Sequence, residues 1–160
     1  MRASLILAVV FSATALGFSA PSEQPANAQA LPLAIIVAPS TTEKDISLAL
    51  VKRIFKGETT EFAGARVVPF SSPQQNAWRS SFDRAVLGFT PEQVGAYWVD
   101  RRIRGQGMPL RSVPEAAVMK AVVAKVPGAI GYVPANELDA SVRALTVDGK
   151  GPNMPGYTIR

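Results

Sequence analysis

The sequence contains no cysteine and no histidine. Without cysteine the chain can form neither a disulfide framework nor a zinc thiolate site. Without histidine it lacks the usual general base of enzymes and the commonest metal ligand in proteins. A Gly-x-Ser-x-Gly elbow and a Ser-x-x-Lys motif are also missing, which leaves little means of activating a nucleophile. We therefore expect a protein that is not an enzyme and that uses no cofactor and no metal.

The apolar run from Leu5 to Phe18 is shorter than the roughly 20 apolar residues that a membrane-spanning helix needs. It follows a cationic start at Arg2 and precedes small-x-small sites that end at Ala28 and Ala30, the layout of a secretory signal peptide. No cysteine follows the run, which excludes a bacterial lipoprotein anchor. We expect residues 1–28 to be a signal peptide, cleaved after residue 28 or 30. The mature protein is then periplasmic or secreted and has no membrane anchor; a retained anchor is the alternative.

The net charge is +5 at pH 7. A cationic surface favours an anionic ligand or an acidic partner. The positive charges are spread among the predicted helices and no recognised nucleic-acid-binding motif is present, so we expect no specific binding to nucleic acid.

Hydrophobic periodicity predicts alternating strands and helices after residue 30. Short apolar runs predict buried strands, and apolar residues three and four apart predict helices. Thr90-Pro91-Glu92-Gln93 and Ser112-Val113-Pro114-Glu115 both show the capping-box pattern of a helix start. The predicted strands are residues 31–38, 66–70, 129–133 and 142–147, and the predicted helices are residues 45–56, 73–87, 91–104 and 113–125.

This alternation predicts an α/β fold in three layers, a mostly parallel sheet flanked by helices. Ligands of such folds bind at the carboxyl ends of strands, near a topological switch point. We expect one domain over residues 31–150, a typical domain size. Residues 151–160 are rich in glycine and proline and are expected to be a flexible tail.

Several segments in a fixed order resemble one protein family. The two most specific segments are Ile54-Phe55-Lys56-Gly57 and Pro127-Gly128-Ala129-Ile130-Gly131-Tyr132-Val133. The others are Leu33 to Pro39, Val67 to Pro69, Phe82 to Gly88, Tyr97-Trp98 and Glu115 to Val118. Together they are similar to the phosphate-type periplasmic substrate-binding proteins of ABC importers, in a shortened form that keeps one of the two lobes. The resemblance covers Leu33 to about Asp148.

The resemblance implies one lobe of a type II periplasmic-binding-protein fold, with phosphate or a similar oxyanion as ligand and an ABC permease as partner. In full-length members the oxyanion lies between two lobes and is gripped by a loop that reads Arg-Ser-x-Gly-Ser-Gly-Thr. The corresponding loop here reads Phe70-Ser71-Ser72-Pro73-Gln74-Gln75-Asn76. The arginine and both glycines are missing, so hydroxyl groups, side-chain amides and main-chain N–H groups would have to hold the anion.

This loop is the first candidate site, because the predicted helix after it would offer unpaired N–H groups and the positive end of its dipole. The alternative is that Ser72 merely caps the helix and Pro73 is its first residue. The candidate anion-binding residues in the loop are Ser71, Ser72, Gln74, Gln75 and Asn76.

Other polar residues could share the anion. Ser40, Thr41 and Thr42 follow the first predicted strand and are expected at the same carboxyl edge of the sheet; ordinary turn residues are the alternative. Arg79 could supply the full charge that the loop lacks, or it could lie solvated on the surface. Arg101-Arg102-x-Arg104 could handle a phosphate, or it could simply be a charged helix end.

We favour an extracytoplasmic, phosphate- or oxyanion-binding protein of the substrate-binding type, associated with ABC phosphate import. The alternative is an interaction or scaffold module of the cell envelope that binds no small ligand, which would account for the altered loop. The two hypotheses differ in the surface at the strand ends: a polar concave surface favours the first, and a flat apolar one favours the second.

Overall fold

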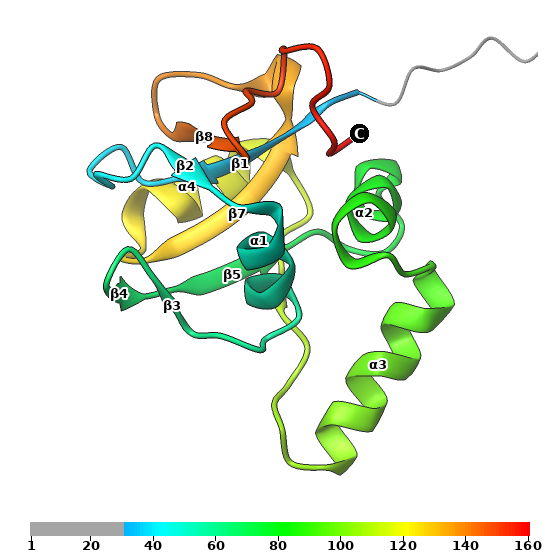
Figure 1. Ribbon diagram of the computed structural model, residues 1–160. Coiled ribbons are helices and arrows are strands. Elements are labelled where there is room, and N and C mark those ends of the chain that lie inside the picture. The colour runs from blue at the N-terminus through cyan, green and yellow to red at the C-terminus, as the bar shows by residue number, and fades with distance from the viewer. Residues whose placement is uncertain (1–30) are drawn as a thin grey trace, which may run out of the picture.

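The computed structural model describes residues 31–160, so the expected signal peptide, residues 1–28, lies outside the described residues. A six-stranded sheet in the order β2-β8-β1-β7-β5-β6 forms the centre of the molecule (Figure 1). Its strands are β1 (Leu33–Val37), β2 (Asp45–Ile46), β5 (Val68–Ser71), β6 (Arg111–Ser112), β7 (Ala129–Pro134) and β8 (Arg143–Val147). A separate two-stranded ribbon contains β3 (Glu61–Phe62) and β4 (Ala65–Arg66). Within residues 31–160, no helix has the length and apolar character needed to span a membrane.

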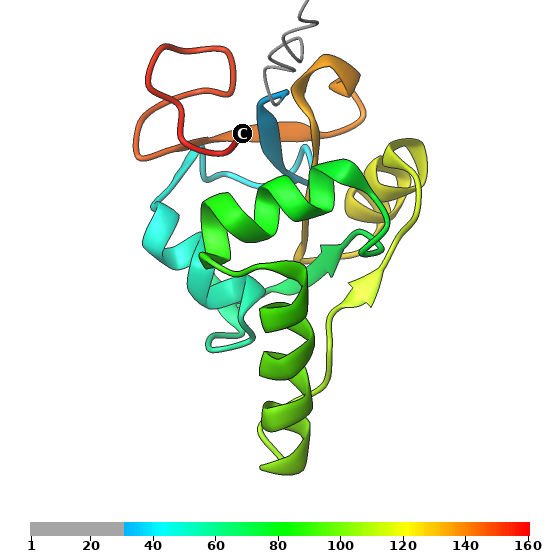
Figure 2. The ribbon, with the colours of Figure 1, turned by 90° about the vertical axis from the view of Figure 1, so that its right-hand side faces the viewer.

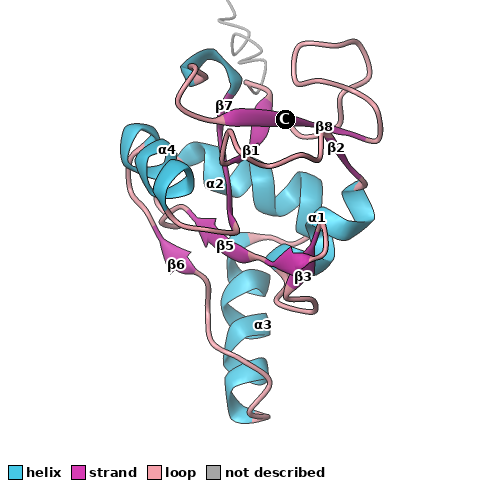
Figure 3. Ribbon diagram, turned by 90° about the vertical axis from the view of Figure 1, so that its left-hand side faces the viewer, coloured by secondary structure: helices cyan, strands magenta, loops and turns pink. Residues whose placement is uncertain are grey.

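Helices cover both faces of the sheet (Figure 3). One buried cluster joins the sheet to α1 (Leu48–Phe55), α2 (Ala77–Phe82), the π-helical turn η1 (Asp83–Leu87) and α3 (Pro91–Ile103). A second cluster joins it to α4 (Ala116–Lys125), and a short 3-10 turn, η2 (Ala135–Glu137), follows β7. The predicted three-layer α/β fold is confirmed. The far end of α3 projects from the body (Figure 2).

The direction of β1 differs from that of its neighbours. β5 is parallel to β6 and β7, and β2 is parallel to β8, as a mostly parallel sheet requires. β1 is antiparallel to both β7 and β8. It is wholly buried, as its continuous apolar sequence predicts. Because β1 runs against β7, its carboxyl end lies beside the amino ends of β7 and β5.

One of the two predicted capping boxes is present. Thr90 N donates to Gln93 Oε1 at 2.8 Å and Gln93 N donates to Thr90 Oγ1 at 3.4 Å, so α3 begins as predicted. The box predicted at Ser112 is wrong, because Ser112 lies in β6 and pairs with Ser71 of β5. Strand pairing at the sheet edge therefore overrides the local capping pattern, and α4 begins only at Ala116.

The expected flexible tail is instead packed against the core. Tyr157 and Ile159 are buried. The Tyr157 hydroxyl donates to the carbonyl oxygen of Leu33 at 2.7 Å, and Leu33 N donates to the carbonyl oxygen of Ile159 at 2.9 Å. The glycines and prolines of residues 151–160 suggest a frayed end, but the two apolar side chains after them hold the segment against β1.

Candidate functional site

A buried arginine is the centre of the candidate site. Arg79 of α2 is 9% exposed. Its Nε donates to Asp83 Oδ2 at 2.6 Å, and its Nη1 donates to Ser71 Oγ at 2.5 Å and to the carbonyl oxygen of Ser72 at 2.6 Å. These three partners, on the helix and on the end of β5, fix the orientation of the guanidinium.

The sequence positions Arg79 and Asp83 on the inner face of the helix. They share the spacing i, i+3, i+4, i+7 with Phe82 and Val86, which are buried, and residues at this spacing lie on one helix face. The alternative that Arg79 is a solvated surface residue is wrong. The sequence already indicated this burial. Arg79 and Asp83 are four residues apart on the apolar face of the helix, and an ion pair on that face is buried together with it.

Tyr132 of β7 ties the same loop to the sheet. Its hydroxyl shares a hydrogen bond with Ser71 Oγ at 3.0 Å and accepts one from Ser72 N at 3.3 Å. Its ring stacks on Phe82, with centroids 3.7 Å apart. Burial raises the pKa of Tyr132, so its hydroxyl stays neutral. Sequence reasoning gave Tyr132 no role beyond the family motif.

The ion pair carries an electrostatic cost as well as an attraction. Burial raises the pKa of the Asp83 carboxyl, and the adjacent Arg79 guanidinium opposes that rise. Within residues 31–160, Asp83 Oδ1 has no hydrogen-bond partner. The carboxylate therefore depends on Arg79 for its charge to be tolerated in the interior.

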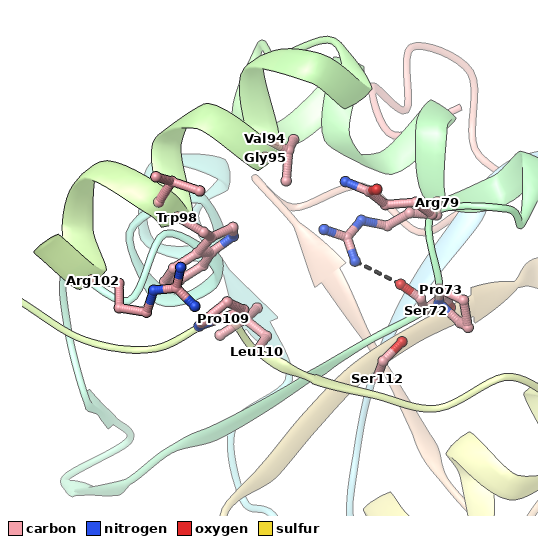
Figure 4. Close-up of a pocket in the computed structure, with 12 residues that line it drawn as sticks. Ser72, Pro73, Arg79, Val94, Gly95, Trp98, Arg102, Pro109, Leu110 and Ser112 are labelled. Carbon is pink, nitrogen blue, oxygen red and sulfur yellow. Dashed lines mark hydrogen bonds between the residues drawn. The ribbon is translucent and has the colours of Figure 1, made fainter.

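The Arg79 guanidinium faces a cavity of about 280 Å³ between α3, the β5–α2 loop and the segment leading into β6 (Figure 4). One end is polar and includes Ser72, Arg79 and Ser112. Arg102 lies at the other end, and apolar side chains of α3 lie between them. The lining residues are Ser72, Pro73, Gln74, Arg79, Val94, Gly95, Trp98, Val99, Arg102, Pro109, Leu110 and Ser112.

Several hydrogen-bond donors at this cavity are unused in the described part of the chain. Arg79 donates its hydrogen bonds through Nε and Nη1, and its Nη2 donates none to residues 31–160. Ser72 is fully buried and its Oγ has no partner within residues 31–160. Arg102, for its part, has no acidic partner among those residues. A guanidinium nitrogen and a nearby hydroxyl are donors that match the oxygens of a small anion.

Of the loop residues predicted to bind the anion, two line the cavity and three do not. Ser72 and Gln74 line the cavity with Arg79. Ser71 is already bonded to Arg79 and Tyr132, and Asn76 Nδ2 donates to the carbonyl oxygen of Pro114 at 2.9 Å. Gln75 is exposed and is not among the lining residues.

The predicted start of the helix after this loop is wrong. α2 begins at Ala77 with Asn76 as its N-cap, so Ser72 does not cap it and Pro73 is not its first residue. The first-turn N–H groups expected beside Ser72 are therefore absent from that position. The charge at the cavity comes from the Arg79 side chain.

The prediction that Ser40 and Thr41 share this edge of the sheet is wrong. With Thr42 they line a separate cavity that also includes Arg66 and Gly128, at the amino ends of β5 and β7. The cause is the antiparallel direction of β1, which sends its carboxyl end to the opposite edge. Ser40 and Thr41 are thus not partners of Arg79.

The three arginines at the end of α3 have different roles. Arg101 Nη2 donates to the carbonyl oxygens of Gly57 and Gln106, at 3.1 Å and 2.6 Å. Arg104 pairs with Asp100 on its own helix. Arg102 alone of the three lines the Arg79 cavity, so the predicted patch contributes one residue to it.

Comparisons with known proteins identify the fold. No family model and no curated protein sequence matches the chain. A protein assigned as a phosphate ABC transporter substrate-binding protein from Clostridium perfringens, solved with bound phosphate, is 24% identical with a TM-score of 0.62. An ABC-type phosphate transport receptor from Vibrio cholerae is 20% identical with a TM-score of 0.64. PstS from Borrelia burgdorferi is 17% identical with a TM-score of 0.62.

The matches are partial for those proteins. They cover 76%, 76% and 81% of this chain but 47%, 48% and 54% of the three structures, so the chain spans about half their length. The chain has the α/β fold of about one half of a phosphate ABC transporter substrate-binding protein.

Proposed function

We propose that this protein binds phosphate or a similar oxyanion in the Arg79 cavity, outside the cytoplasm, as a substrate-binding protein associated with ABC import. The observation that carries the proposal is the fixed guanidinium of Arg79, which is buried against Asp83 and Ser71 and keeps one nitrogen toward the cavity. The signal-peptide layout of residues 1–28 supports the location. The likeness to phosphate-binding proteins supports the ligand class.

The charge balance at the cavity favours an anion. Asp83 offsets the charge of Arg79, and Arg102 adds a second positive charge without an acidic partner among residues 31–160. Ser72 and Ser112 add hydroxyl donors from the ends of β5 and β6. A partly enclosed site raises the strength of each charged hydrogen bond relative to bulk water. In this proposal Arg79 replaces the arginine that the loop sequence lacks.

Replacing Ser72 by Ala is expected to weaken phosphate binding about tenfold, the effect of one hydrogen bond to a charged ligand. Folding stability should stay the same or rise, because the variant removes a buried hydroxyl without a partner in the described chain. The measurement is isothermal titration of phosphate into residues 29–160 at low salt, with thermal unfolding in parallel.

Gln75→Ala is the matched control, because Gln75 lies in the same loop but outside the cavity. Sulfate titrated into the unaltered protein tests selectivity between oxyanions. An equal loss of affinity in the Gln75 and Ser72 variants would place the site elsewhere on the loop. No heat with phosphate and no change in thermal stability at millimolar phosphate would refute the proposed function.

An interaction module is the second candidate, favoured by the projecting end of α3. Ile103, the last residue of α3, is 77% exposed, and Met108, in the segment that follows, is 67% exposed. Large exposed apolar side chains are candidates for protein contacts. If this surface serves self-association, sedimentation velocity should show a concentration-dependent dimer that Ile103→Asp abolishes. A monomer at all concentrations, with phosphate bound, would favour the first candidate.

A further inference from the structure

We propose that the ligand of the Arg79 cavity is an organic anion, a phosphate or phosphonate group that carries a small apolar or aromatic substituent. This inference rests on the proposed function and narrows its ligand class. The anionic group would lie at the Arg79 and Ser72 end, and the substituent would lie along α3. Inorganic phosphate then binds the same end of the site, but less tightly.

The composition of the cavity wall is the first support. Between the polar end and Arg102, the wall includes Val94, Gly95, Trp98 and Leu110 (Figure 4). The Val94 and Leu110 side chains and Gly95, which has none, offer a bare oxyanion no side-chain hydrogen bond, and the indole N–H of Trp98 is the one side-chain donor among these four residues. An anion placed against the aliphatic part of the wall would lose its hydration without compensation. An apolar substituent gains free energy in the same place by leaving water.

The size of the cavity is the second support. At about 280 Å³ it approaches the lower end of the roughly 300–1,000 Å³ range of small-molecule sites. An inorganic phosphate held by Arg79 and Ser72 would fill only one part of this volume. The remaining space extends along α3 toward Arg102, in the direction that a substituent would take.

Gly95 is the third support, because it opens the apolar part of the cavity. It lies in the interior of α3, where glycine costs up to about 1 kcal/mol relative to alanine. A Cβ at this position would meet no atom within 4 Å, so packing does not require glycine there. Its φ is not among the positive values of the chain, so backbone conformation does not require it either. What glycine provides at this position is open space in the cavity wall.

The test compares inorganic phosphate, phenylphosphonate and benzyl alcohol by isothermal titration. Phenylphosphonate should bind at least about tenfold more tightly than phosphate, as burial of an aromatic ring predicts. Gly95→Leu should remove that advantage, because the leucine side chain fills the apolar part of the cavity. The variant should unfold at a higher temperature, since leucine is the better helix former.

Ala96→Leu is the matched control, because Ala96 is exposed on the next position of α3 and does not line the cavity. It should leave both affinities unchanged. Phosphate and phenylphosphonate binding equally tightly would overturn the inference and leave the proposed function standing. Neither anion binding would overturn both. Benzyl alcohol binding as tightly as phenylphosphonate would show a purely apolar site and overturn both as well.

Discussion

Replacing Arg79 by Met is expected to lower the free energy of unfolding by about 3–5 kcal/mol, the usual cost of removing one partner of a buried ion pair. The variant leaves the Asp83 carboxylate buried without its cation and leaves Ser71 Oγ and the Ser72 carbonyl without their donor. Phosphate binding should be lost in the same variant. Denaturant titration followed by circular dichroism measures the first effect, and isothermal titration on the folded fraction measures the second.

The loss in Arg79→Met should become smaller as the pH falls from about 7 to about 5. Burial already raises the pKa of Asp83, and Arg79 opposes that rise, so removing Arg79 raises the pKa further. A folded-state pKa above the unfolded value destabilises the fold at pH values above it, and protonation relieves this cost as the pH falls. A loss that grows with acidity would contradict this assignment.

Two further variants separate the ion pair from simple packing. Arg84→Met alters an exposed arginine on the same helical segment and should change stability by no more than about 0.5 kcal/mol. The double variant Arg79→Met with Asp83→Leu should recover most of the loss, because an apolar pair of similar volume can replace a buried ion pair. If Arg79→Met costs no more than Arg84→Met, the pair does not behave as a buried unit.

The sequence predicted the layers of the fold better than it predicted the direction of β1. Continuous apolar runs predict burial on both sides, and β1 and β7 are indeed buried along their length. A continuous apolar run indicates burial on both faces, and β1 shows that an antiparallel strand buried on both faces can have the same run as a parallel one. The wrong prediction for Ser40 and Thr41 has this cause, because the direction of β1 decides at which edge of the sheet these residues lie.

The candidate site was predicted in part. The β5–α2 loop was expected to bind the ligand, and Ser72, Gln74 and Arg79 do line the cavity. The contribution of α3 was not predicted, because no local pattern brings Gly95 or Trp98 to the end of β5. That contact arises when the chain turns back at Gly88, which takes a left-handed conformation at φ +73° and ends η1.

The motif that most resembles the phosphate-binding family serves packing more than ligand contact. Along residues 127–133, a Cβ on Gly131 would lie 2.7 Å from Met119 Sδ, so this glycine permits α4 to pack closely on β7. Tyr132 alone among these residues connects to the site, through Ser71 and Ser72. The motif therefore predicts the fold with more certainty than it predicts the ligand.

Gly128→Ala is expected to destabilise the fold by about 2–5 kcal/mol, the sum of left-handed strain and a backbone displacement. Gly128 has a φ of +74°, and a Cβ there would lie 2.1 Å from the carbonyl oxygen of Arg66. The two segments are held together because Val68 N donates to the carbonyl oxygen of Gly128 at 2.8 Å. Relief of the contact would thus pull β5 away from β7. Denaturant titration measures the loss.

Gly64→Ala is the control that isolates the steric contact, because Gly64 has a φ of +71° and a Cβ there would meet nothing within 4 Å. It should show the conformational strain alone, about 1–2 kcal/mol. The difference between the two variants then measures the displacement of Arg66 from Gly128. Equal losses would mean that Arg66 can move away from Gly128 without a measurable loss of stability. In that case the hydrogen bonds from Arg79 to Ser71 and Ser72, and not the β5–β7 contact, would hold these two serines beside Tyr132.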